Sequence, residues 1–389
     1  MTEPQTEPHP QTLQILDRLI GFPTVSAESN LALISYAEDL LRAAGFATWR
    51  LPDASGRKAG LMARLGAGEG GVMLSAHSDV VPAEGQSWTC PPFALTRRGD
   101  RLHGRGSTDM KGFLAAMLSL AGRAGDLRQP LMLAISFDEE VGVTGIRQML
   151  PGIRALGWQP ELCIVGEPTS MRPAIGHKGK AAYLATCHGV AGHSSMAPDW
   201  LNALHLAADL IGALRAMQDT YAATGAREDG HDLPYSTVHA GRMSGGTALN
   251  IVPDRARVEF ELRHLAADRP EDFQAALQAR IAALLQPYRA RHPQAAIEIA
   301  QTNSYPGLAI APDHPAVRRV AALSGAGGPV KVAYGTEAGY FAALGIPTLV
   351  CGPGDMQGQG HKPDEYLDIA QLAACDRMLD RLLAQLRAG

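Results

Sequence analysis

Short apolar runs alternate with helix-like stretches along much of the chain, and this alternation limits the possible folds more than any other feature. The apolar runs occupy residues 71–76, 131–137, 162–165 and 347–351. The helix-like stretches include residues 12–20, 31–43, 110–120 and 145–150. Strands that are apolar throughout are typical of sheets buried on both faces. The pattern therefore predicts an α/β fold with a mostly parallel sheet covered by helices.

A different pattern begins near residue 179. The expected order is a polar-alternating strand, a helix, two strands, a second helix and a last strand, over residues 180–190, 202–217, 236–243, 257–263, 270–285 and 295–300. This βαββαβ order is that of the split βαβ, or ferredoxin-like, unit. A chain of 389 residues suits two domains. We therefore expect residues 179–303 to form a domain inserted into a first domain of residues 1–178 and 304–389.

Charge and composition exclude several classes of protein. The formal net charge is −4 and no run of Lys or Arg occurs, which argues against a nucleic-acid binder. No segment approaches the roughly 20 apolar residues that span a bilayer. The N-terminal segment MTEPQTEPHPQT lacks the cationic and apolar parts of a signal peptide. The five cysteines form no CxxC pair. We expect a cytoplasmic protein with reduced thiols and with neither nucleic acid nor membrane as a partner.

Five short segments carry acidic or histidine residues after apolar runs or in glycine-rich loops. They are SAHSDVVP, GRGSTDMKG, SFDEEVG, IVGEPT and GQGHKPDEY. In open α/β sheets, sites form beyond the carboxyl ends of the strands, so these side chains are expected to converge. Several carboxylates brought together without a cation would raise one another's pKa and destabilise the fold. Two histidines and three carboxylates, with one carboxylate shared, suit two zinc-type ions.

Two neighbouring positions in these segments suggest supporting roles. Asp79 follows His77 by two residues, so on an extended chain it faces the same side and can accept the second ring N–H. Glu139 and Glu140 are adjacent, so one can ligate a metal while the other handles protons. Taken singly, these residues have simpler explanations: Asp109 fits a helix N-cap, and the DEE run fits a solvated turn. Only the combination predicts a metal centre.

In this order and spacing, the five motifs resemble the aminoacylase/carboxypeptidase (M20) family of co-catalytic zinc hydrolases, from about His77 to Glu365. The resemblance implies a mixed-sheet, two-zinc aminopeptidase-like catalytic domain with an inserted ferredoxin-like lid that dimerises. It also implies two divalent metal ions per subunit, zinc or alternatively cobalt. The implied ligands are His77 and Glu167 for one ion, Glu140 and His361 for the other, and Asp109 as the bridge. Asp79 would orient His77, and Glu139 would be the general base.

Four further residues are expected to contact the substrate. His193, in GVAGHSS, resembles a lid histidine that donates to an oxyanion. Asn250 and Arg263 lie in a segment that resembles the family's substrate-facing stretch, and an Arg fork suits a carboxylate. Glu337 would face a substrate ammonium group. The residues alone favour His193 as an ordinary polar loop residue. They fit Arg263 equally as a surface charge at a strand end, and nearly as well Glu337 as a plain loop carboxylate.

The stretch over residues 334–354, followed by GHKPDEYL, is similar to the branch of this family that deacetylates acetylornithine in arginine biosynthesis. It is less like the branch that desuccinylates succinyl-diaminopimelate. The implied reaction is hydrolysis of the N-acyl amino acid N2-acetyl-L-ornithine to L-ornithine and acetate by a homodimer. A desuccinylase, an aminoacylase and a metallo-carboxypeptidase stay open as alternatives. So does a metal-binding pseudoenzyme scaffold, although Glu139 argues against it.

Overall fold

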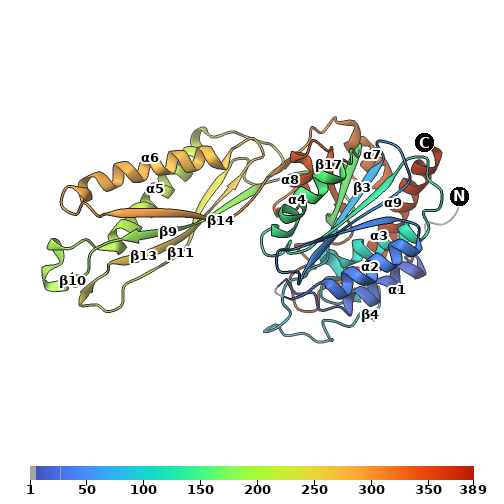
Figure 1. The fold of residues 1–389 in the computed structure, drawn as a ribbon, viewed down its shortest axis with the longest axis horizontal. Helices are drawn as coiled ribbons and strands as arrows, with labels where there is room; N and C mark the ends of the chain where they lie inside the picture. Colours follow the sequence, from blue (N-terminus) through green and yellow to red (C-terminus); the bar gives the residue numbers. More distant parts are fainter. Residues whose placement is uncertain (1–5, 27) are drawn as a thin grey trace. The chain divides into compact units, whose positions relative to one another are not determined.

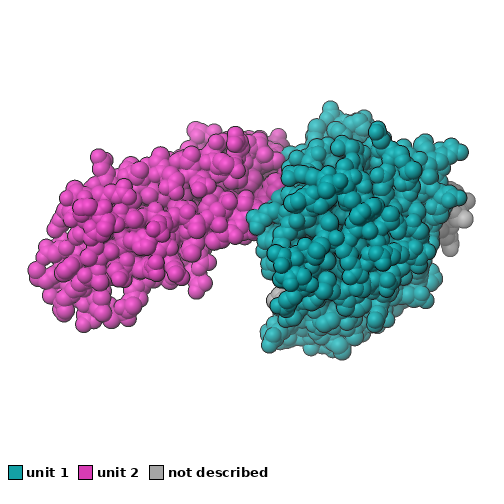
Figure 2. Space-filling view, in the orientation of Figure 1, with its two compact units in different colours: residues 1–176, 308–332, 336–389 teal, residues 177–307, 333–335 magenta. Residues whose placement is uncertain are grey.

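The computed structural model describes residues 6–26 and 28–389. Residues 1–5, which begin the segment considered above for a signal peptide, lie outside that description. The chain divides into two compact units (Figure 2). Unit 1 contains the residues up to Gly176 together with Leu308–Val332 and Thr336–Gly389, and unit 2 contains His177–Gly307 and Ala333–Gly335. The insertion expected over residues 179–303 falls inside unit 2.

A mixed sheet forms the centre of unit 1, with strand order β1-β2-β6-β3-β7-β17-β8-β15 and with β16 paired to β8. Its strands are β1 (Ala47–Pro52), β2 (Ala59–Leu65), β3 (Val72–His77), β6 (Leu131–Ser136), β7 (Leu162–Pro168), β8 (Ala174–His177), β15 (Leu308–Ala309), β16 (Val330–Val332) and β17 (Thr348–Gly352). The central strands β6, β3, β7 and β17 run parallel. The flanking pairs β1-β2, β2-β6 and β17-β8 are antiparallel. The expected parallel strands thus form only the centre of the sheet. At its edge, the short connection between β1 and β2 permits only an antiparallel hairpin.

Helices cover both faces of this sheet (Figure 1). One face carries α1 (Pro10–Ile20), α2 (Leu31–Ala43), α3 (Gly112–Gly122), α7 (Pro315–Ser324) and α9 (Ile369–Ala388), which share the larger hydrophobic core. The other face carries α4 (Thr144–Leu156) and α8 (Ala338–Ala343). Helix α3 is buried along almost its whole length, as expected of a helix that is apolar all round. A small sheet joins β4 (Thr96–Arg98), β5 (Arg101–His103) and β18 (Tyr366–Asp368).

Unit 2 has the βαββαβ order expected from the sequence. Its antiparallel sheet has the strand order β11-β13-β9-β14, formed by β9 (Gly179–His188), β11 (Thr237–Gly245), β13 (Arg255–His264) and β14 (Ala296–Tyr305). The helices α5 (Ala203–Thr224) and α6 (Pro270–Arg289) pack on the sheet and share its core. Two short strands, β10 (Gly192–His193) and β12 (Ile251–Val252), pair beside the 3₁₀ turn η2 (Ser194–Asp199). Burial alternates along β9, because one sheet face is packed and the other is open.

Two further expectations concern the whole chain. All five cysteines are free and buried. Within the described residues, none of the helices combines the length and the apolar character needed to cross a membrane.

Candidate metal centre

The parallel strands of unit 1 bring three of the expected ligands to one edge of the sheet. His77 is the last residue of β3, Glu167 lies at the end of β7, and Glu140 follows β6. Because β6, β3 and β7 are adjacent and parallel, their carboxyl ends meet at this edge. Asp109 lies in the irregular turn η1 (Ser107–Lys111), just before α3, and His361 lies in the loop between β17 and β18.

The five side chains form two clusters that share Asp109. In the first cluster, His77 Nε2 lies 3.0 Å from Asp109 Oδ1 and 3.6 Å from Glu167 Oε1. In the second, His361 Nε2 lies 3.0 Å from both Asp109 Oδ2 and Glu140 Oε2. Each cluster offers one ligand atom per residue, all within 4.8 Å of one another. Asp109 therefore presents one carboxylate oxygen to each cluster.

The crowding of carboxylates shifts the ionisation of the whole group. Burial, together with the charge of Asp109, raises the pKa of Glu140 to about 7 and raises that of Glu167 well above its usual range. Burial acts on Asp109 as well, but hydrogen bonds from His361 and His77 hold its pKa well below the usual range. Hydrogen bonds to Asp109 and Glu140 raise the pKa of His361 to about 10. The negative charge of the carboxylates thus favours protons or cations between them.

The donor set fits two divalent cations. Imidazole nitrogens and carboxylate oxygens are the ligands that zinc and similar ions take in catalytic sites. Glu140 Oε1 and Glu167 Oε1 are buried and have no hydrogen-bond partner. A buried carboxylate oxygen without a partner is costly, and coordination of a cation would satisfy it. The shared carboxylate of Asp109 has the arrangement of a bridging ligand.

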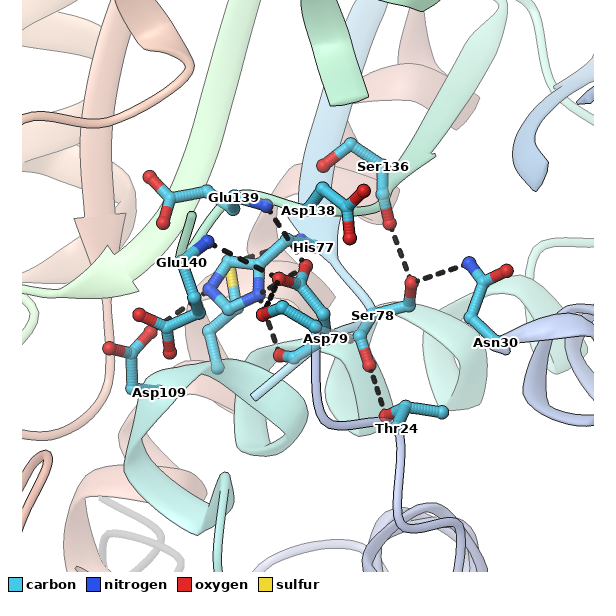
Figure 3. Close-up of polar contacts among 12 residues, drawn as sticks. Thr24, Asn30, His77, Ser78, Asp79, Asp109, Ser136, Asp138, Glu139 and Glu140 are labelled. Atoms are coloured by element: carbon cyan, nitrogen blue, oxygen red, sulfur yellow. Dashed lines mark hydrogen bonds and ion pairs between the residues drawn. The ribbon is translucent and has the colours of Figure 1, made fainter. Parts of the chain in front are cut away.

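Asp79 contacts both His77 and the turn that carries the two adjacent glutamates (Figure 3). His77 Nδ1 lies 2.9 Å from the backbone oxygen of Asp79 and 3.5 Å from its carboxylate. The carboxylate accepts the N–H groups of Glu139, at 3.1 Å, and Glu140, at 3.2 Å. The side chain predicted to orient His77 therefore also fixes the backbone of the DEE segment.

The side chains of Glu139 and Glu140 diverge from this turn (Figure 3). Glu140 extends toward Asp109, whereas the carboxylate of Glu139 points away from it. Burial raises the pKa of Glu139 well above its ordinary value, against the opposing charge of His77. A carboxyl group with a raised pKa beside a metal-ligand cluster is suited to carrying a proton.

One supporting pair was not expected from the sequence. Arg105 and Glu365 form an ion pair at 2.6 Å, with each side chain only 1% exposed. The other carboxylate oxygen of Glu365 accepts the backbone N–H groups of Thr108, at 3.0 Å, and Asp109, at 3.2 Å. Glu365 thus holds the turn that presents Asp109. It belongs to the HKPDEY motif that contains His361, but nothing in the motif indicates its partner.

Three of the four expected substrate residues lie in unit 2. His193 is exposed, and its Nδ1 accepts the N–H of Ser195 at 3.2 Å. Asn250 is exposed in the segment before β12. Arg263, in β13, donates to Glu261 at 2.9 Å and to the Tyr305 hydroxyl at 2.8 Å. Unit 2 holds these three residues, whereas unit 1 holds both metal-ligand clusters.

The fourth residue, Glu337, departs from its expected role. It lies in unit 1 just before α8 and is completely buried. Its two carboxylate oxygens accept the hydroxyls of Ser75 and Ser136, each at 2.5 Å. The loop packs this carboxylate against β3 and β6, so in this structure Glu337 does not face a substrate ammonium group.

Comparison with known proteins places the chain in a family. Residues 73–385 match the family model of peptidase family M20/M25/M40. Acetylornithine deacetylase of Pasteurella multocida is 32% identical over 393 residues, covering 98% of this chain and 99% of that protein. Acetylornithine deacetylase of Myxococcus xanthus is 34% identical over 383 residues, covering 96% and 97%.

Solved structures agree with this relationship at the level of the fold. An M20 family metallo-carboxypeptidase from Sulfolobus solfataricus has a TM-score of 0.76 at 20% identity, covering 97% of this chain and 100% of that one. A dinuclear metal-binding M20 peptidase from Bacillus subtilis has a TM-score of 0.67 at 16% identity, covering 98% of each. The family match, the full-length relatives and the paired clusters lead to one conclusion: the chain belongs to peptidase family M20/M25/M40 and is a metal-dependent hydrolase.

Proposed function

We propose that this enzyme removes the acetyl group from N2-acetyl-L-ornithine to give L-ornithine and acetate. The observation that carries this substrate assignment is similarity to curated acetylornithine deacetylases over 96% or more of the chain. Similarity of that extent includes unit 2 as well as the metal-ligand clusters of unit 1. In this proposal the enzyme acts in the cytoplasm, in arginine biosynthesis.

The proposed cofactors are two divalent cations, zinc first and cobalt as the alternative. The two clusters support His77 and Glu167 as ligands of one ion, Glu140 and His361 as ligands of the other, and Asp109 as the bridge. When bound, the cations would polarise the acyl carbonyl and make a neighbouring water more acidic. Neutralising the charge of the clusters would also lower the raised pKa values of Glu140 and Glu167 and keep both carboxylates ionised.

Glu139 is proposed as the general base. It would take a proton from the water that attacks the acyl carbonyl and return it to the departing amine. Its place beside Glu140, with a side chain that diverges from the clusters, supports this division of labour. Asp79 would keep the base in position, since it accepts the N–H groups of both glutamates.

Unit 2 is proposed as a lid that supplies substrate contacts. His193 Nδ1 accepts a backbone N–H, which leaves the proton of the neutral ring on Nε2, the form that donates to an oxyanion. Arg263 would bind the substrate carboxylate, and its contacts with Glu261 and Tyr305 hold the guanidinium in one orientation. Asn250 would add a further polar contact.

The lid is also proposed to form the homodimer. Unit 2 exposes several large apolar side chains, and such groups mark a contact surface where they gather into one patch. They are Met196, Trp200, Leu233, Met243, Leu249 and Ile251. The mass of the protein in solution, measured by light scattering, tests this part of the proposal.

One experiment tests the proposed function directly. The metal content of the purified enzyme is measured, and kcat/KM is compared on acetylornithine, succinyl-diaminopimelate and acetylmethionine. We expect two metal ions per chain and a clear preference for acetylornithine. A broad preference for acetylated neutral amino acids would identify an aminoacylase, and preference for the succinylated substrate a desuccinylase. Metal binding without turnover on any N-acyl or peptide substrate would favour a pseudoenzyme scaffold.

A further inference from the structure

Lys58 contacts the DEE turn although it is distant in sequence from all the expected site residues. It lies just before β2, and its ammonium group forms an ion pair with Asp138, the residue that precedes Glu139. The same ammonium group donates to the backbone carbonyl of Ser26. The side chains of Lys58 and Asp138 are only 14% and 15% exposed. A pair so far withdrawn from water differs from the exposed ion pairs that contribute little.

These contacts close into a ring around the DEE turn. The hydroxyl of Ser26 donates to Asp79 at 2.7 Å, while the carbonyl of Ser26 accepts from Lys58. Asp79 in turn accepts the N–H groups of Glu139 and Glu140. The turn is therefore held at two points, by Asp79 at its backbone and by Lys58 through the side chain of Asp138, and Ser26 joins the two.

The backbone at Asp138 shows why a second holding point matters. Its φ angle of +52° lies in the left-handed region, which costs a residue other than glycine conformational energy, although less for Asp and Asn than for most. Its carbonyl accepts the N–H of Thr144 at 3.0 Å, which closes the turn onto the start of α4. From this bend the side chains of Glu139 and Glu140 leave in different directions (Figure 3).

We propose that Lys58 is a positioning residue for hydrolysis: by binding Asp138 and tying it to Ser26, it fixes the turn that places Glu139 for proton transfer and Glu140 for metal binding. This inference rests on the proposed function, because it assigns Lys58 a role in the same reaction. It differs from a purely stabilising role, which would change the free energy of unfolding and leave kcat and metal affinity unchanged.

A double-mutant cycle separates these roles. The variants are Lys58→Met, Asp138→Asn and the combination, with Arg57→Met as the matched control, because Arg57 is the exposed cation next in sequence. Asn tolerates the left-handed conformation at position 138, so Asp138→Asn removes charge with little change in the backbone.

At saturating zinc we expect Lys58→Met to lower kcat about 10- to 100-fold while KM changes less than about 3-fold. The combined variant is expected to be no worse than the poorer single variant, because both changes break one contact.

A second readout is the affinity for metal, measured by competition with a chelator. We expect the dissociation constant of the more weakly held zinc to rise about 10-fold in Lys58→Met, because Glu140 leaves the same turn, and to stay unchanged in Arg57→Met. This readout stays valid if the wild-type enzyme cleaves none of the three N-acyl substrates, a result that would count against the proposed function alone. If Lys58→Met does not fold, Lys58→Gln, which keeps a hydrogen-bond donor, takes its place in the cycle.

Three results would overturn the proposal. The first is a folded Lys58 variant with wild-type kcat and wild-type zinc affinity. The second is losses in kcat that multiply in the combined variant, which would show that Lys58 and Asp138 act independently. The third is an equal loss in Arg57→Met, which would show a general effect of charge.

Discussion

The two units hold most of their candidate functional residues in opposite ways. In unit 1, His77, Asp109 and Glu167 are at most 6% exposed, and their charges depend on one another. Of the proposed ligands, only His361 is exposed. In unit 2, His193 and Asn250 are exposed, and Arg263 is partly exposed. Changing one member of a buried ionic cluster leaves the charges of its partners uncompensated, so the change affects stability and metal binding as well as chemistry. We therefore expect changes in unit 1 to couple stability with activity, and changes in unit 2 to affect activity alone.

The largest expected effect separates two neighbours within unit 1. Glu139→Ala should keep its metal but lower kcat by about 10² to 10⁴, the usual contribution of general acid–base catalysis. Glu140→Ala should lose both metal and turnover, because Glu140 is the proposed ligand. Metal analysis and steady-state kinetics of the two variants provide the check. Near-normal kcat in Glu139→Ala would remove it as the general base.

The next effect tests the structural side of unit 1. Glu365→Gln removes the carboxylate that pairs with the buried Arg105, whose other acceptors, Pro82 O and Gln86 Oε1, are uncharged, and this should cost about 3–5 kcal/mol of stability. Replacing both residues, as Arg105→Met with Glu365→Gln, should recover part of the loss. The guanidinium carbon of Arg105 lies 5.0 Å from the ring centroid of Trp88. Tryptophan fluorescence can therefore follow denaturation around this pair. Equal stability of Glu365→Gln and wild type would contradict the coupling expected in unit 1.

His193→Ala tests the opposite expectation for unit 2. Loss of an oxyanion donor typically costs about 2.7–4 kcal/mol in the transition state, or about 10²- to 10³-fold in kcat. Because His193 is exposed, the thermal midpoint of the variant should stay within about 1 °C of the wild-type value. Calorimetry beside kinetics measures both quantities. A variant that is destabilised but fully active would reverse the comparison between the units.

The smallest expected effect concerns the pH dependence of the metal-stripped protein. Asp109 and Glu140 raise the pKa of His361 to about 10. The stability that protonated His361 gives the folded protein is therefore complete below the ordinary pKa of 6.5 and is lost as the pH rises toward 10. The thermal midpoint of the stripped protein should therefore fall by several degrees between pH 7 and pH 10. Zinc should flatten this slope, since a ligating histidine is already neutral. His361→Gln, with a shallower slope than wild type, is the matched control.

Local sequence patterns predicted much of the fold. The helical periodicity near residues 12–20 and 31–43 corresponds to α1 and α2, and the apolar runs before His77 and Asp138 correspond to β3 and β6. Such patterns report how a segment is buried, which its own residues largely decide. The sequence made no assignment for β1 and β2, whose antiparallel pairing depends on a turn and on neighbouring strands. The two serine partners of Glu337 were not expected either, because only packing against β3 and β6 brings them to its carboxylate.

By itself, the sequence determined the α/β class, the βαββαβ insertion, and the residue types that a two-metal centre requires. These follow from periodicity, spacing and the electrostatic need for cations among three carboxylates. Only the tertiary structure decided which oxygen of Asp109 meets which histidine, and that Asp79 binds the backbone of the DEE turn. It alone brought Lys58 to Asp138 and Glu365 to Arg105. Those contacts join segments 80 and 260 positions apart, and no local pattern specifies which distant charge will fill a buried site.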